Sequence, residues 1–145
     1  MMATLGIKEA FSRYGASLVN VQWSVSAWAP DGALVVSLWD HHRRKGLAGT
    51  LEFAASAGRW KGPGNSEFRE NVKKAFESGA KVYLVIVRTE DVARVEAGED
   101  ASKIKKFFSV RQDLVGSVIE WDGENYAFRF TKASLTSGAA RGTTT

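Results

Sequence analysis

The sequence predicts a single α/β domain of the α+β kind. We expect a mixed sheet of about five or six strands, N- and C-terminal hairpins and a central crossover helix, with two or three helices packed on one face of the sheet. Three observations support this prediction. Alternating apolar and polar residues lie toward both ends of the chain, a helix with one apolar face lies in its middle, and a continuous apolar run follows that helix. With 145 residues, the chain is long enough to bury one core without disulfides or a structural metal.

The N-terminal part predicts a short helix followed by a hairpin. Between Leu5 and Tyr14 apolar residues recur at helical spacing, and Gly15 is placed to end the helix. From Val21 to Ala27 apolar and polar residues alternate, as in a strand with one buried face. The sequence WAPDGAL then predicts a tight turn, so that Leu34 to Trp39 completes the hairpin.

The middle of the chain predicts a strand, a helix and a second strand. Thr50 to Ala54 is typical of a short strand, and a glycine-rich loop follows it. Asn65 is placed to cap the next helix, Gly79 is placed to end it, and its apolar face carries Phe68, Val72, Ala75 and Phe76. The continuous run from Lys81 to Arg88 is typical of a strand covered on both faces. We therefore expect a crossover unit with parallel pairing.

The C-terminal part predicts a second hairpin and a tail. After an acidic loop that holds a helical turn, two strands are expected about a turn at Asp122 and Gly123. Residues 133–145 have too few apolar side chains to join a core. The expected organisation is one globular domain over residues 1–132 and a disordered tail over 133–145.

Composition narrows the possible locations and cofactors. The chain has no cysteine, which excludes disulfides and thiolate metal sites and favours a reducing compartment. The N-terminus does not have the pattern of a signal peptide, and no segment approaches eighteen consecutive apolar residues. We expect a cytoplasmic protein that contains no membrane span and needs no cofactor.

Charge is unevenly distributed along the chain. The formal net charge is +4, and residues 41–81 hold nine lysines or arginines against four acids. Residues 89–101 hold five acids against Arg94 alone. If the middle third gathers on one surface, that surface attracts phosphate, and we expect the acidic loop to lie elsewhere.

Few residues fit a known catalytic pattern. His41 and His42 are adjacent, so in an extended chain they would point apart, and we predict no metal site. The chain lacks a G-x-S-x-G elbow, a phosphate-binding P-loop and a strand-borne acid-x-Lys pair. Asp40, His41 and Glu52 leave a hydrolase or nuclease open as a less favoured alternative to a solvated loop. We therefore predict no catalytic residue.

Anion recognition is the function that the remaining residues favour. One loop carries three consecutive cations, a second places Trp60 between two cations, and the second loop leads into a helix N-terminus, where backbone N–H groups favour phosphate. Trp60 could stack on a base. The predicted nucleic-acid-binding residues are Arg43, Arg44, Lys45, Arg59, Trp60, Lys61 and Asn65. This prediction requires the two loops to converge on one surface.

Two other interpretations of these residues stay open. A run of Lys and Arg is often simply a solvated loop. The five tryptophans also allow a protein-interaction or small-ligand module that uses an exposed aromatic sheet face. Trp28 and Trp60 border turns and are the expected exposed tryptophans, whereas Trp23, Trp39 and Trp121 are expected in the core or at its margin.

Residues 20–88 also resemble a known group of domains. The segments NVQWSVSAWAPDGALVVSLWD and RWKGPGNSEFRENVKKAFESGAKVYLVIV, with the basic loop between them, resemble small uncharacterised domains found alone or attached to HNH-type restriction endonucleases. Some domains in such company recognise modified DNA. The resemblance implies a DNA-reading module in a restriction or defence context, with cleavage left to a partner nuclease.

Overall fold

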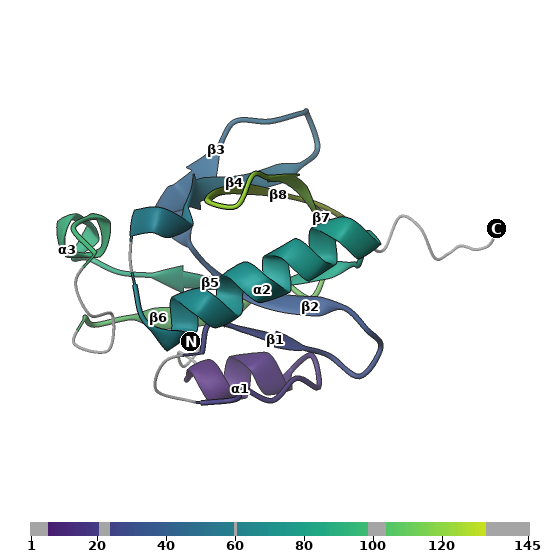
Figure 1. Cartoon of the computed structure of the whole chain (residues 1–145), viewed down its shortest axis with the longest axis horizontal. Coiled ribbons are helices and arrows are strands. Elements are labelled where there is room, and N and C mark those ends of the chain that lie inside the picture. The colour runs from purple at the N-terminus through teal and green to yellow at the C-terminus, as the bar shows by residue number, and fades with distance from the viewer. Residues whose placement is uncertain (1–5, 21–23, 60, 99–103, 133–145) are drawn as a thin grey trace, which may run out of the picture.

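The computed structural model describes residues 6–20, 24–59, 61–98 and 104–132. Its core is an eight-stranded mixed sheet with helices α1 and α2 packed on opposite faces (Figure 1). In chain order the elements, with η for a 3-10 helix, are α1 (Ile7–Ser12), β1 (Ser26–Trp28), β2 (Leu34–Trp39), η1 (Asp40–His42), β3 (Arg43–Arg44), β4 (Leu51–Ser56), η2 (Ala57–Arg59), α2 (Pro63–Ser78), β5 (Val82–Arg88), α3 (Val92–Glu96), β6 (Phe107–Val110), β7 (Leu114–Trp121) and β8 (Asn125–Lys132).

The sheet has the strand order β1-β2-β5-β7-β8-β4-β3, with β6 also paired to β5. β2 and β5 run parallel over six residue pairs, and the other pairings are antiparallel. In Figure 1, β3, β4 and β8 lie on one side of α2, while β1 and β2 lie on the other. β3 and β1 thus lie at the two ends of this path, with the parallel pair in its interior, and β6 adds a further short strand beside β5.

The core has two parts because β2 and β5 are buried on both faces. Leu34, Val36 and Leu38 of β2 belong to the cluster beneath α2, together with Phe68 and Val72 of the helix. The intervening Val35 belongs to the second cluster, beneath α1. The period of two along β2 therefore divides its apolar side chains between two helices, and β5 is a continuous apolar run for the same reason.

The structure confirms the mixed α/β fold class and several of its elements. The N-terminal hairpin forms about Gly32, which has a φ of 89°, and the C-terminal hairpin joins β7 to β8. The central helix ends at Gly79, whose φ of 68° is the left-handed value expected there. Residues 133–145, for which we expect a disordered tail, lie outside the described residues.

Four expectations are wrong in detail. The sheet has eight strands, because β3 and β6 were not expected. The parallel partner of β5 is β2 rather than the strand before α2, since β4 pairs antiparallel with β8 and β3. The two larger helices pack on opposite faces of the sheet instead of sharing one. Phe76 lies 42% exposed on α2, outside the core.

The start of α2 also differs from the prediction. The helix begins at Pro63, and Gly62 is its N-cap residue with a φ of 114°. Proline suits the first helical position, because its ring fixes φ and the missing N–H would have no helical partner there. Asn65 therefore lies inside the first turn and makes no capping hydrogen bond.

None of the described helices is both long enough and apolar enough to span a membrane.

Candidate functional site

The C-terminal ends of β2 and β5 meet at one edge of the fold. Because the strands are parallel and Trp39 pairs with Val87, the segments that follow them leave the sheet side by side. η1 follows β2 directly, and α3 begins four residues after Arg88, the last residue of β5. Crevices outside the carboxyl ends of parallel strands are where ligands commonly bind in α/β sheets. We call Asp40, His41, His42, Arg88 and Glu96 the strand-end site.

Both imidazoles of the strand-end site face one carboxylate. His41 Nε2 lies 2.9 Å from Glu96 Oε2, and His42 Nε2 lies 2.7 Å from the same oxygen. The sequence-based expectation that the histidines point apart is wrong, because they lie on a 3-10 turn and not on an extended strand. Their rings meet edge to face with centroids 4.5 Å apart, and the Trp39 ring lies beside His41.

A carboxylate shared by two arginines lies next to the histidines. Arg43 contacts Asp40 Oδ1 through both Nε, at 2.8 Å, and one terminal nitrogen, at 2.7 Å. Arg88 Nε lies 3.7 Å from the other oxygen of Asp40. The side chains of Arg43 and Arg88 are 42% and 63% exposed. Two guanidinium groups against one carboxylate leave one positive charge in excess beside Asp40, while the Glu96 carboxylate of the same site faces the histidines.

A ladder of alternating charges lies on the sheet face that points away from α2, and it consists of Arg44, Glu52, Arg129 and Glu120. Glu52 is 3% exposed and accepts hydrogen bonds from Arg44 Nε at 2.9 Å and Arg129 Nε at 2.7 Å. Arg44 also donates to Glu120 at 2.9 Å. Arg129 first, and then Arg44, lower the pKa of Glu52. Arg44 therefore neutralises acids of the protein, which leaves it less available to an external phosphate.

The loop after β3 is closely fitted to the same ladder. A Cβ at Gly46 would lie 2.4 Å from the Glu52 carboxylate carbon, so a side chain there would displace Glu52. Glycine thus allows the backbone of this loop to approach the buried acid.

The N-terminal turn of α2 is engaged within the fold. Asn65 is buried, and its Nδ2 donates to the carbonyl oxygen of Ala57 at 2.6 Å. Its Oδ1 accepts from Arg69 Nε at 2.8 Å, and Arg69 also donates to the carbonyl oxygen of Gly123. Gly64 is buried as well. Asn65 therefore joins α2 to η2 and, through Arg69, to the β7–β8 turn, and its side chain does not face a surface phosphate.

The two predicted cation clusters lie at different places along β4. Arg43 pairs with Phe53, and η2 begins four residues later, about 13 Å along the strand at roughly 3.3 Å per residue. Arg43 packs over Phe53 on the α2 face, whereas Arg44 pairs with Glu52 on the opposite face. Lys45 and Lys61 are exposed, while Trp60 and the side chain of Arg59 lie outside what the structure describes. The described residues of the two predicted clusters thus do not form a single cluster.

The acidic segment is not remote from the basic segment. Glu96 belongs to the acidic segment and contacts His41 and His42, directly before Arg43. The expectation that the acidic loop lies elsewhere is therefore wrong. Glu96 was also missed as a site residue, because it lies 54 residues from His42 in the chain. The parallel pairing of β2 with β5 is the signal that would have placed it there.

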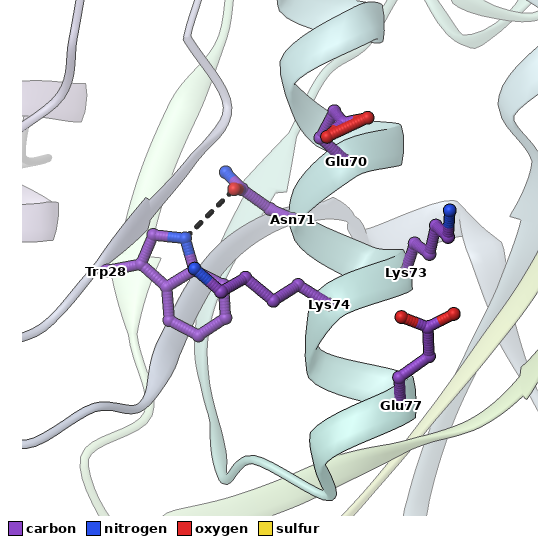
Figure 2. Close-up of a pocket in the computed structure, with 6 residues that line it drawn as sticks. All are labelled: Trp28, Glu70, Asn71, Lys73, Lys74 and Glu77. Carbon is purple, nitrogen blue, oxygen red and sulfur yellow. Dashed lines mark hydrogen bonds between the residues drawn. The ribbon is translucent and has the colours of Figure 1, made fainter.

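A separate shallow groove lies between β1 and α2 and has a volume of about 350 Å³ (Figure 2). Half-buried Trp28 forms one wall, and its Nε1 donates to Asn71 Oδ1 at 2.9 Å. Lys74 Nζ lies 5.5 Å from the centre of the Trp28 ring. The remaining lining residues are Glu70, Lys73 and Glu77, so the charges around the groove balance.

The aromatic side chains of the second half of the sheet pack inward. Tyr126, Phe128 and Phe130 of β8 lie in the cluster beneath α2. Trp39 and Trp121 are half-buried at the margins of the core, and Trp23 lies outside the described residues. Among the described residues, the face of β3, β4 and β8 that points away from α2 carries the charge ladder instead of an aromatic patch.

Comparison of the chain with protein-family models, with curated proteins and with solved structures gave no match.

Proposed function

We propose that the chain is a DNA-binding module that acts in a restriction or defence context. The observation that carries the proposal is the sharing of Asp40 by Arg43 and Arg88, which leaves one exposed positive charge beside Asp40. Phosphate contacts from Arg and Lys provide most of the sequence-independent affinity for DNA. The resemblance of residues 20–88 to domains associated with HNH-type endonucleases supports the context, with a partner nuclease for cleavage and a preference for modified bases.

The structure changes which residues the proposal assigns to phosphate. Arg43, Lys45 and Arg88 are exposed cations, of which Arg43 and Arg88 meet at Asp40, and the exposed Lys61 follows η2. Arg44 is assigned to positioning, because it is held by Glu52 and Glu120. Asn65 is not assigned to phosphate, because both of its polar groups form hydrogen bonds within the fold.

Matched charge variants test this surface. The Lys45→Gln/Arg88→Gln double variant removes two cations from the proposed surface, and Lys8→Gln/Lys81→Gln removes two exposed cations on α1 and before β5. Both variants change the net charge equally, so a difference between them reports location. Binding to labelled duplex DNA is measured by fluorescence anisotropy at several salt concentrations, with plain and with cytosine-modified duplexes.

The expected result is a local effect on salt dependence. Each lost phosphate contact lowers the slope of log K against log salt concentration by about 1, so Lys45→Gln/Arg88→Gln should lower it by about 2. Lys8→Gln/Lys81→Gln should leave it near the wild-type value. Equal slopes for the two variants would count against the proposed surface, and salt-insensitive binding would favour a protein-interaction or small-ligand module.

A further inference from the structure

We infer that His41, His42 and Glu96 form a binding site for a divalent transition-metal ion of the zinc class. Among the described residues, they are the group whose potential ligand atoms all lie within 4.8 Å of one another. Two imidazole nitrogens and one carboxylate oxygen are a ligand set that suits zinc and its neighbours in the first transition series, while Mg²⁺ and Ca²⁺ prefer oxygen ligands alone.

The distances are close to those that a bound ion requires. Zn–N and Zn–O bonds of about 2.0 to 2.2 Å place two ligands of a tetrahedral ion roughly 3.3 Å apart. The two Nε2–Oε2 distances are 2.9 and 2.7 Å, so each has to open by about 0.5 Å. Glu96 can supply that movement, because it is the last residue of α3 and its side chain is 45% exposed.

The two histidines are held more firmly than the carboxylate. The side chains of His41 and His42 are 20% and 8% exposed, and the Trp39 ring lies 5.7 Å from that of His41. The 3-10 turn that orients them is flanked by extended residues at Trp39 and Arg43. Two positioned imidazoles and one adjustable carboxylate provide a partly formed site with an exposed side through which an ion can enter.

Three protein ligands leave room for a fourth. A tetrahedral ion held by His41, His42 and Glu96 would keep one position for water or an external ligand, which distinguishes this arrangement from a closed structural site. The ion would also connect η1 to α3, and hence the segments that follow β2 and β5. The inference does not depend on DNA binding and extends the role of the strand-end site beyond it.

Zinc titration of the whole chain tests the inference. The chain contains only two histidines and no cysteine, so an untagged, chelator-dialysed preparation offers no other imidazole or thiolate ligand. Isothermal titration with ZnCl₂ should give one saturable site. Glu96→Gln and His42→Gln should each weaken it by at least about 100-fold, because even outer-shell substitutions at metal sites cost 10- to 100-fold.

Glu90→Gln is the matched control for charge. Glu90 is an exposed acid in the segment between β5 and α3, and its substitution should leave zinc affinity unchanged. Two further measurements report the site itself. Co²⁺ should give the visible absorption bands of a four- or five-coordinate ion in the wild type and not in His42→Gln. Zinc at a hundredfold excess over Kd should raise the Tm by roughly 10 °C in the wild type and in Glu90→Gln only.

The outcomes decide the matter in either direction. Absence of saturable zinc binding by the wild type would overturn the inference, as would binding that survives unchanged in Glu96→Gln. A Glu90→Gln effect as large as that of Glu96→Gln would point to general attraction by the acidic segment and would also overturn it. If circular dichroism finds His42→Gln unfolded, Glu96→Gln decides alone, because its exposed side chain is dispensable for packing.

Discussion

Asn65→Ala separates a structural role from a phosphate-binding role at the start of α2. The substitution removes the hydrogen bond to the carbonyl oxygen of Ala57, a residue that is 0% exposed, and the bond from Arg69. We expect it to destabilise the fold while leaving the DNA affinity of the folded protein unchanged. The reason is that the Asn65 side chain is turned into the protein.

The size of the effect follows from the two bonds. A buried carbonyl that loses its partner costs about 1 to 3 kcal/mol, and the bond from Arg69 contributes about 1 kcal/mol because that guanidinium keeps its bond to Gly123. Alanine returns roughly 0.5 kcal/mol, since it is the better helix former. The expected loss in the free energy of unfolding is therefore about 1.5 to 3.5 kcal/mol, which a domain of ordinary stability survives.

Urea denaturation followed by tryptophan fluorescence measures this loss, and DNA anisotropy without urea measures binding. Ser66→Ala is the control, because Ser66 is exposed in the same helical turn and its substitution should change stability by less than about 0.5 kcal/mol. The structural role of Asn65 is refuted if Asn65→Ala is as stable as Ser66→Ala and binds DNA at least tenfold more weakly than the wild type does. That result would place Asn65 on a phosphate after all.

Two further predictions concern acid stability and the close packing of β7 against β8. Arg111 holds the pKa of Asp113 well below its usual value of 3.8. The lowered pKa of Asp113 stabilises the fold fully above pH 3.8, and this stabilisation is lost as the pH falls further below that value. Asp113→Asn should therefore unfold at a lower urea concentration than the wild type at pH 6, and the two urea midpoints should approach each other as the pH falls to 3 and below. A gap that stays constant with pH would contradict this. Gly116→Ala should cost about 1 to 3 kcal/mol by overpacking, because its Cβ would lie 2.3 Å from the backbone oxygen of Arg129. Ser117→Ala is its exposed neighbour control, and equal urea midpoints for the two would refute the clash.

Elements that face a core were predictable from the sequence, because burial imposes a period on them. β2, α2 and the C-terminal hairpin each carry apolar side chains at the spacing of their own geometry. β3 has only Arg43 and Arg44, which are both exposed, so no period marks it. The pairing of β5 with β2 joins segments about fifty residues apart, and hydrophobic pattern alone cannot choose among such partners.

The candidate site was less predictable, because its chemistry depends on partners distant in the sequence. Arg44 looks like a phosphate ligand until Glu52 and Glu120 are brought beside it. His41 and His42 gain their shared carboxylate only when β2 and β5 align. The number of unpaired cations was overestimated, because the sequence shows the charges but not the ion pairs that form when the chain folds.

The shortness of the two outermost strands also affects how the protein behaves in solution. On the described residues, β1 spans three residues and β3 spans two, and arginine side chains line the latter. Strands this short offer a neighbouring molecule too few unpaired amide and carbonyl groups to extend the sheet. Self-association by strand addition at β1 or β3 is thereby disfavoured at high protein concentration.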